Sequence, residues 1–212
     1  MYEQERESMV DYQLKKRGIQ NPYLLEVMRI LPRHEFIPDI SRPMAYGDFA
    51  IPVGQGQTCS QPYVVAKMID LSEPRRTDKV LHIGTGLGYT TAVLARLSGK
   101  VIGIERIPEF AQKANQNLKR TGIKNAKVIV GDGSIGAIHY YPFDKVIITA
   151  ALPKIPEEII QQTRTNGIII APIGTRMKQK IIRARKTPQG LQIQEHDDVS
   201  FVPVLGKNGF EI

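Results

Sequence analysis

The sequence has one cysteine, no tryptophan and no long run of apolar residues. The single cysteine, Cys59, excludes an intramolecular disulfide and a zinc site built from several cysteines, and it fits a reducing compartment. Every apolar run is shorter than the roughly 18 residues of a membrane-spanning helix, and the first residues lack the apolar core of a signal peptide. We therefore expect a cytoplasmic protein.

The four histidines also lack the arrangement of a metal site. His34 and His139 have no partner at the spacing of metal ligands, and His196 lies in an acidic stretch. We therefore predict that the protein holds no metal.

Positive charge is abundant but concentrated. The net charge is +8, and residues 159–194 contribute +7 because they hold seven basic side chains and no acidic one. A basic surface is typical of proteins that bind nucleic acid, membrane surfaces or acidic substrates. The solvated face of a β-hairpin explains the same pattern, and we favour this simpler interpretation.

The 212 residues, 42% hydrophobic and 24% charged, suit one globular domain with an appendage. From residue 79, short runs of valine and isoleucine alternate with segments of helical periodicity. This alternation predicts an α/β fold with a doubly wound, mostly parallel sheet. Strands are expected over 80–83, 101–104, 128–130, 146–149 and 168–171, and helices over 90–97, 108–121 and 156–164.

The regions on either side of this core have different patterns. Residues 1–36 predict two helices broken near Gly18 and Pro22, and residues 61–71 predict a third helix. Residues 36–61 are too apolar for a linker and indicate an ordered binding segment. A β-hairpin is expected over 180–185 and 191–195, with a further strand over 199–204.

We therefore predict a single domain over residues 1–212 with three regions. These are an N-terminal helical and substrate-loop region (1–78), a cofactor-binding core (79–175) and a C-terminal hairpin and strand (176–212).

Three closely spaced glycines, Gly84, Gly86 and Gly88, follow the first core strand and precede a helix. Such a loop lets the backbone approach a ligand at the carboxyl edge of the sheet. The spacing departs from the dinucleotide fingerprint, which needs a glycine where Tyr89 stands, and no P-loop motif is present.

Two acidic residues follow the next two strands. Glu105 ends the second core strand, where a carboxylate can accept both hydroxyls of a ribose and disfavours a 2′-phosphate. Asp132 follows the third core strand, where it can accept from an adenine amino group. With the glycine loop, they describe a pocket for adenosine without phosphate, the pattern of class I S-adenosylmethionine-dependent methyltransferases with a Rossmann-like fold. NAD binding is the lesser alternative.

The segment after the fourth core strand narrows the methyl acceptor. Residues 149–153 read Thr-Ala-Ala-Leu-Pro and lack the Asp/Asn-Pro-Pro-Tyr/Phe tetrapeptide of many enzymes that methylate amino groups. Cytosine-C5 enzymes need a nucleophilic cysteine, but Cys59 follows Thr58 and has no activating base nearby in the sequence. We therefore interpret Cys59 as a packing residue.

The sequence also resembles the protein-L-isoaspartate (D-aspartate) O-methyltransferase family. The matching segments occur in family order over about residues 12–206, and the Gly-Gln-Thr-x-Ser-Gln-Pro segment is specific to this family among methyltransferases. They are 33–38 (RHEFIP), 45–48 (AYGD), 56–63 (GQTCSQPY), 83–89 (IGTGLGY), 104–106 (IER), 131–133 (GDG), 142–144 (PFD), 149–151 (TAA) and 201–203 (FVP).

The resemblance implies a repair enzyme. It would transfer a methyl group from S-adenosyl-L-methionine to the free carboxylate of L-isoaspartyl residues, with D-aspartyl residues as a further acceptor, and would release S-adenosyl-L-homocysteine. The ester then cyclises to a succinimide. The expected partners are age-damaged peptides and proteins, with no membrane or nucleic acid, and a monomer is favoured.

The resemblance and the motifs together predict the site residues. Ser60 is expected beside the methyl donor and the acceptor carboxylate as the catalytic residue, with a helix N-cap as the alternative role. The residues expected to bind the cofactor are Thr58, Ser60, Gly84, Thr85, Gly86, Gly88, Glu105, Arg106, Asp132 and Gly133. Those expected to hold the damaged peptide are Ile51, Val53, Gly54 and Gln57.

One residue departs from the family pattern. Family members usually carry an acid where His82 stands, and in this fold class that acid supports the methionine ammonium. His82 is therefore either a neutral packing residue or a cause of weaker cofactor binding. Three alternatives stay open: a methyltransferase for nucleic acid, one for small molecules, and a cofactor-binding protein that has lost activity.

Overall fold

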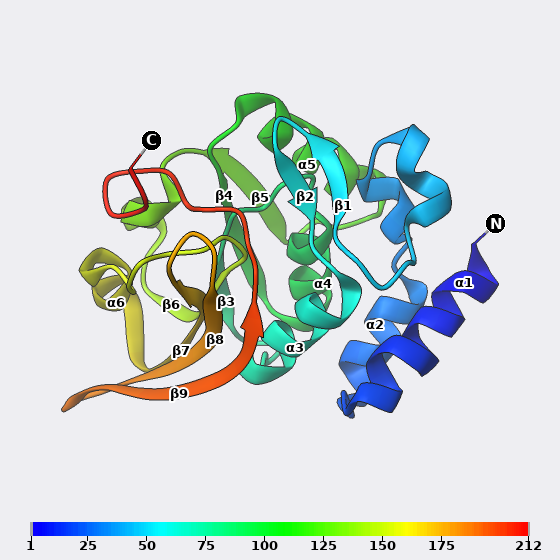
Figure 1. Ribbon diagram of the computed structural model, residues 1–212. Coiled ribbons are helices and arrows are strands. Elements are labelled where there is room, and N and C mark those ends of the chain that lie inside the picture. Colours follow the sequence, from blue (N-terminus) through cyan, green and yellow to red (C-terminus); the bar gives the residue numbers. More distant parts are fainter. Residues whose placement is uncertain (1, 212) are drawn as a thin grey trace.

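The computed structural model describes residues 2–211, and its centre is a seven-stranded sheet with helices on both sides (Figure 1). The strand order is β5-β4-β3-β6-β7-β8-β9; β5 to β7 pair in parallel, and β8 and β9 are antiparallel. The strands are β3 Lys79–Ile83, β4 Lys100–Glu105, β5 Ala126–Val130, β6 Phe143–Ile148, β7 Thr163–Gly174, β8 Gln179–Thr187 and β9 Gly190–Val199. The predicted mostly parallel sheet and the C-terminal hairpin are thus confirmed.

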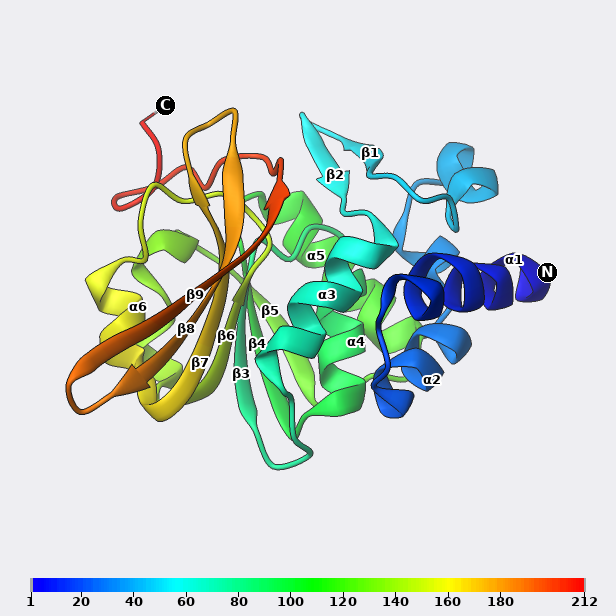
Figure 2. The same cartoon turned by 60° about the horizontal axis from the view of Figure 1, so that its bottom comes forward.

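Helices cover both faces of the sheet (Figure 2). One face carries α3 (Pro62–Ser72), α4 (Tyr89–Leu97) and α5 (Pro108–Arg120), and the other carries the short α6 (Glu157–Gln162). The central strands β3, β4 and β6 are buried over most of their length, and their alternating apolar side chains enter two separate cores. Val80 packs with the α3–α5 side, for example, and Leu81 packs with Ile159 of α6.

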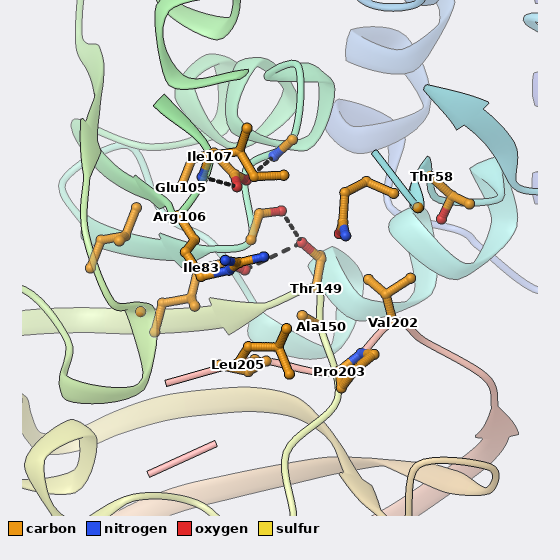
Figure 3. A pocket seen from close by; sticks show the side chains of 17 residues that line it. Thr58, Ile83, Glu105, Arg106, Ile107, Thr149, Ala150, Val202, Pro203 and Leu205 are labelled. Carbon is orange, nitrogen blue, oxygen red and sulfur yellow. Dashed lines mark hydrogen bonds between the residues drawn. The ribbon is translucent and has the colours of Figure 1, made fainter. Parts of the chain in front are cut away.

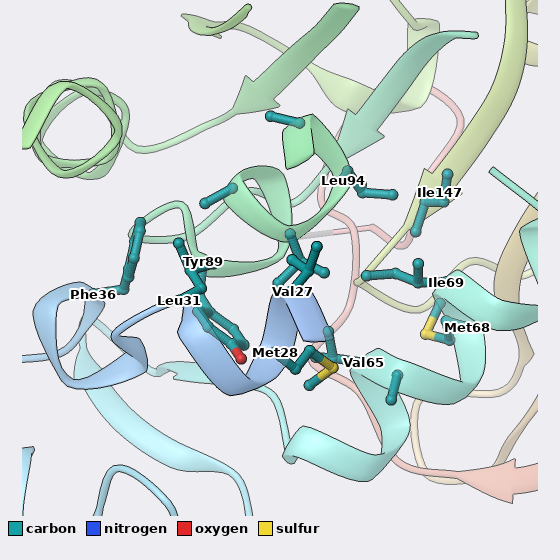
Figure 4. Close-up of a cluster of buried hydrophobic side chains, with 14 of the residues drawn as sticks. Val27, Met28, Leu31, Phe36, Val65, Met68, Ile69, Tyr89, Leu94 and Ile147 are labelled. Atoms are coloured by element: carbon teal, nitrogen blue, oxygen red, sulfur yellow. The ribbon is translucent and has the colours of Figure 1, made fainter. Parts of the chain in front are cut away.

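The larger of the two cores extends to the N-terminal helices (Figure 4). The first helix, α1 (Glu3–Ser8), continues through a π-helical turn, Met9–Leu14, and a 3-10 turn, and the chain then turns at Gly18 with a φ of +94°. The second, α2 (Pro22–Ile30), begins at Asn21, whose side chain accepts from two backbone N–H groups. The predicted break between two helices is therefore confirmed. Every helix in residues 2–211 is too short or too polar to cross a membrane.

Residues 36–61 are ordered, as expected, and contain a hairpin that the sequence patterns did not indicate. Its strands are β1 (Ile51–Gly54) and β2 (Gln57–Cys59), and the turn residues Gln55 and Gly56 have φ of +49° and +69°. Two successive positive φ angles suit a tight hairpin turn. The hairpin brings this loop next to the carboxyl edge of the main sheet, as its contribution to the pocket described below shows.

The strand predicted over 199–204 is wrong. β9 ends at Val199, and the following chain meets the residues after β6 in an isolated parallel bridge between Ala151 and Pro203. Two backbone hydrogen bonds hold it there: Ala151 N–H donates to Val202 and Val204 N–H donates to Ala151. We call residues 200–208 the C-terminal strap; it runs across the end of β6 instead of extending the sheet.

Candidate active site

A pocket opens at the carboxyl ends of β3, β4 and β6, between the β1–β2 hairpin and the C-terminal strap (Figure 3). Parallel strands whose crossovers lie on opposite faces leave a crevice at this edge. Predicted site residues that line it are Gln57, Thr58, Gly84, Gly86, Glu105, Arg106 and Gly133. Segments more than a hundred residues apart in the chain thus share one cavity, since Gln57 and Leu205 both contribute to its wall.

The three loop glycines have different roles. Gly84 and Gly86 line the pocket with φ of +82° and +54°, and a Cβ on Gly86 would meet no atom within 4 Å. Gly88 begins α4 with a φ of +99°, and a Cβ there would lie 3.3 Å from Ala114 of α5. Gly86 therefore leaves backbone open to a ligand, whereas Gly88 permits close packing between two helices.

Glu105 is the buried acid of the pocket, with 8% of its surface exposed. Its two carboxylate oxygens accept from the backbone N–H groups of Gly86, at 2.8 Å, and Ile107, at 3.0 Å (Figure 3). These bonds offset the cost of burying the charge and fix the direction of the carboxylate. Each oxygen keeps a second lone pair, so the group can still accept from two hydroxyls of a ligand.

Asp132 lies beside the pocket, but its carboxylate is directed to the chain itself. One oxygen accepts from the Ser134 N–H and hydroxyl, and the other accepts from Lys207 N–H of the C-terminal strap at 2.8 Å. Burial opposes ionisation of Asp132, but these hydrogen bonds outweigh it and hold the pKa below its ordinary value. In this structure Asp132 therefore anchors the strap; its Oδ1 has both lone pairs engaged, whereas its Oδ2 keeps one for a ligand.

His82 is fully buried beneath the glycine loop, and burial lowers its pKa to about 3. Its Nε2 lies 3.0 Å from the Thr149 hydroxyl, and its Nδ1 lies 2.8 Å from the Thr91 hydroxyl. Because the Thr149 hydroxyl donates to the Gly84 carbonyl, it must accept from His82, which places the imidazole proton on Nε2. The departure from the family pattern is thus a neutral imidazole that orients Thr149, a wall residue of the pocket.

Ser60 lies just before α3, in a smaller cavity that also includes Thr58, Thr85 and Val53. Its hydroxyl makes no hydrogen bond with residues 2–211, and the N-cap position of α3 belongs to Gln61. The alternative role of Ser60 as a helix cap is therefore not seen. The hydroxyl is available to a ligand near the glycine loop.

Other predicted residues of the substrate loop are placed differently. Ile51 is fully buried in the core, where it supports the hairpin, and Gly54 stands at the hairpin turn with a φ of +101°. Cys59 packs against the larger core, in agreement with the packing role expected for it. In residues 2–211 no group of three or more histidine, cysteine, aspartate or glutamate side chains could hold a metal ion.

Several wall residues were not among the predicted site residues. Thr149 and Ala150 follow β6, and residues 202–205 belong to the C-terminal strap. Both segments carry family motifs (TAA and FVP), which is the signal that could have identified them. Ile83, Ile104 and Ile107 also line the pocket, but no feature of the sequence distinguishes them from other isoleucines at or near the ends of strands.

The basic segment 159–194 lies mainly on β7, β8 and β9, and acids from other parts of the chain pair with most of it. The ion pairs are Arg164–Asp144, Lys178–Asp198, Lys180–Glu195, Arg183–Glu73 and Arg185–Glu73. Lys186 instead donates to the carbonyls of Ile160 and Thr163 at 2.7 Å. The segment therefore includes most of the expected hairpin, and four acids from outside it offset part of its charge of +7.

The fold and the site define a class I S-adenosylmethionine-dependent methyltransferase. The family model described as "Protein-L-isoaspartate(D-aspartate) O-methyltransferase (PCMT)" matches residues 4–209. The chain belongs to this protein-L-isoaspartate O-methyltransferase family.

Curated relatives and solved structures agree. The chain is 42% identical over 207 residues to a protein-L-isoaspartate O-methyltransferase of Methanoculleus marisnigri, covering 98% of this chain and 94% of the relative. It is 41% identical over 217 residues to one of Methanopyrus kandleri, covering 100% of this chain and 96% of the relative. A solved protein-L-isoaspartate O-methyltransferase matches with a TM-score of 0.85 at 26% identity, over 96% of this chain and 66% of that chain.

A further solved structure supports the fold. The Plasmodium falciparum protein, described as a complex with S-adenosyl-L-homocysteine, matches with a TM-score of 0.80 at 24% identity, over 94% of this chain and 98% of that chain. Family membership confirms the reaction expected from the sequence: methylation of isoaspartyl residues in damaged proteins with S-adenosylmethionine as the donor. It favours this repair reaction over methylation of nucleic acid or small molecules.

Proposed function

We propose that Ser60 and the β1–β2 hairpin bring the free carboxylate of an L-isoaspartyl residue to a methyl donor held by the glycine loop and Glu105. The observation that carries this proposal is that the hairpin and the cofactor core line the same pocket. Its lining includes Gln57 and Thr58 of the hairpin together with Gly84, Gly86 and Glu105. The hairpin side would hold the damaged peptide, with Val53 and Gln57 nearest the site. D-aspartyl residues are the further acceptor.

The wall residues fit the nucleoside part of S-adenosylmethionine. Glu105 keeps one lone pair on each oxygen for the two ribose hydroxyls, and Gly86 leaves its backbone open beside it. Ile104, Val202 and Leu205 offer apolar surface for the adenine ring. Arg106 and Gly133 also line this nucleoside pocket. Thr58, Thr85 and Ser60 line the smaller cavity at the other end of the glycine loop.

The reaction needs no general base. A side-chain or α-carboxyl group with a pKa of roughly 4 is already ionised at neutral pH, and S-adenosylmethionine, when bound, supplies an electrophilic methyl group on a sulfonium. The Ser60 hydroxyl would donate to one carboxylate oxygen and leave the other to attack. Catalysis then depends on in-line positioning, and both ring nitrogens of the buried His82 are engaged with Thr91 and Thr149, so it takes no part in proton transfer to the substrate.

The division of the chain into three regions is part of the same proposal. Residues 1–78 supply the substrate loop, 79–175 the cofactor core and 176–212 the hairpin and strap of a single domain. The oligomeric state in this proposal is a monomer. The half-buried free thiol of Cys59 suits a reducing compartment such as the cytoplasm.

The test compares an isoaspartyl peptide with its aspartyl twin in the presence of labelled S-adenosylmethionine. We expect base-labile methyl ester on the isoaspartyl peptide alone. Ser60→Ala should lower kcat by about tenfold or more, since it removes one hydrogen bond to the reacting carboxylate, while cofactor affinity by calorimetry stays unchanged.

Ser72→Ala is the matched control, because Ser72 lies at the other end of the same helix and donates only to the Ile69 carbonyl. It should leave kcat unchanged. Cofactor binding without ester on either peptide would instead identify a binding protein that has lost activity. An undiminished rate in Ser60→Ala would remove Ser60 from the mechanism.

A further inference from the structure

Arg33 is a fully buried arginine without an acidic partner. It is 0% exposed, and within residues 2–211 no carboxylate oxygen lies within 4 Å of its guanidinium. The acid closest in sequence, Glu35, pairs instead with Arg120 at 2.9 Å and with Arg42 at 3.9 Å. Burying an unpaired charge is costly, so its place in the fold calls for a compensating interaction.

The contacts of Arg33 compensate its charge only in part. Its Nε donates to the Ala45 carbonyl at 2.7 Å, and one Nη donates to the Ser60 carbonyl at 2.9 Å. The guanidinium carbon lies 4.8 Å from the centre of the Tyr89 ring. The other Nη is buried and has no hydrogen-bond partner in residues 2–211. Carbonyl dipoles and a ring face stabilise the cation without cancelling its charge.

This charge lies directly behind the proposed site of methyl transfer. Ser60 and Tyr89, both contacts of Arg33, line the small cavity that also includes Thr85 of the glycine loop. The hydroxyls of Thr85 and Tyr89 are buried and likewise have no partner within residues 2–211. A positive potential therefore reaches the cavity through protein of low polarity, where it is screened less than in water.

We propose that Arg33 is a positioning residue that holds the Ser60 backbone and selects a negatively charged acceptor over a neutral one. This inference rests on the proposed function, since the acceptor in question is the isoaspartyl carboxylate. Two properties of Arg33 act together. Its guanidinium donates to the carbonyls of both Ser60 and Ala45, which fixes the Ser60 hydroxyl relative to the glycine loop. Its positive charge, which no acidic partner balances, attracts the isoaspartyl carboxylate.

The experiment measures binding in the complex with S-adenosylhomocysteine, where no turnover occurs. Two peptides are compared by calorimetry: one with an isoaspartyl residue, and the same peptide with that free carboxylate replaced by a carboxamide. The unmodified protein should prefer the carboxylate peptide by at least about tenfold. Arg33→Met should abolish most of this preference, whereas Arg33→Lys, which keeps the charge, should retain most of it and lower kcat because the fork is lost.

Arg183→Met is the matched control. Arg183 is also nearly buried, but it pairs with Glu73 at 2.6 Å and donates to the Leu71 carbonyl, away from the pocket. It should lose stability and keep the preference for the carboxylate peptide. Binding of S-adenosylhomocysteine reports that each variant is folded; if Arg33→Met is not folded, Arg33→Gln provides the uncharged variant.

A preference that survives in Arg33→Met or Arg33→Gln, or that Arg183→Met also loses, would overturn the inference, as would an unmodified protein that binds both peptides equally. Failure of the proposed function is recognised separately, because the unmodified protein would then form no methyl ester on the isoaspartyl peptide whatever its binding preference.

Discussion

At the scale of single residues, the pocket combines two ways of placing a polar group in an apolar interior. The Glu105 side chain receives two backbone N–H donors, so its burial is tolerated and its direction is fixed. His82 is neutral and lies between two threonine hydroxyls. A neutral imidazole cannot offer the methionine ammonium the attraction that an acid would. What it provides is a fixed Thr149 beneath the loop.

The state of His82 predicts a pH dependence of stability. Its pKa is about 3 in the folded protein, against 6.5 when exposed, so below about pH 6.5 the unfolded chain binds a proton that the folded one does not. Stability should therefore fall as the pH falls, by about 1 kcal/mol per pH unit from this residue. His82→Gln keeps a donor and an acceptor but cannot be protonated, so it should lose less stability.

Urea unfolding of both proteins between about pH 7.5 and about pH 4.5 measures this difference. Carboxylates and the other histidines titrate equally in the two proteins, and their contribution cancels. Parallel stability curves for the two proteins would contradict a buried neutral His82.

At the scale of elements, the C-terminal strap closes the pocket. Lys207 N–H donates to Asp132, and Asn208 N–H donates to the Ser134 hydroxyl at 3.0 Å, so four residues join the strap to the turn after β5. The space is also tight, because a Cβ on Gly206 would lie 2.1 Å from an Asp132 oxygen. Asp132 thus acts on the ligand mainly through the strap.

Asp132→Ala should loosen the strap. It leaves the Lys207 N–H without its partner, and we expect about 1–3 kcal/mol less stability and about tenfold weaker cofactor binding. Hydrogen exchange at Lys207 and Asn208 should become faster, while exchange in β3 and β4 stays slow. Asp11→Ala removes a surface carboxylate paired with Arg29 and is the control. Unchanged exchange at Lys207 would rule out the anchoring role.

At the scale of the whole molecule, ion pairs balance part of the positive charge that is concentrated in residues 159–194. The basic residues of 159–194 that form ion pairs meet acids from β9, from the end of α3 and from the start of β6. Exposed pairs of this kind contribute little stability, but they lower the positive potential of the hairpin. The positive potential around these strands is therefore lower than the seven basic residues alone would give.

We accordingly expect only weak RNA binding. Anisotropy of a labelled single-stranded RNA should give dissociation constants no tighter than about 1 μM at about 200 mM salt, the level of non-specific association. Methylation of the isoaspartyl peptide should change little between about 50 and about 200 mM salt. Nanomolar RNA binding with a steep salt slope would revive the nucleic-acid alternative.

The sequence by itself determined the core of the fold and the side of the sheet where the pocket lies. Runs of valine and isoleucine separated by helical segments specify a parallel sheet because both faces must be buried. The ends of neighbouring parallel strands meet at one edge, so the glycine loop and Glu105 could be placed together from their order alone. Within this core, only the ends of some elements, such as the longer β7, differ from the pattern.

The tertiary structure alone decided what closes the pocket and which charges act in it. The strap reaches Asp132 and Ala151 through its own backbone groups, so the FVP motif marks the segment but does not reveal what it binds. The burial of Arg33 beside Ser60 depends on the packing of Tyr89 and Ala45, and local sequence gives no sign that its charge lacks a partner. Long-range packing sets burial, and burial decides whether a polar side chain is solvated, neutral or directed at a ligand.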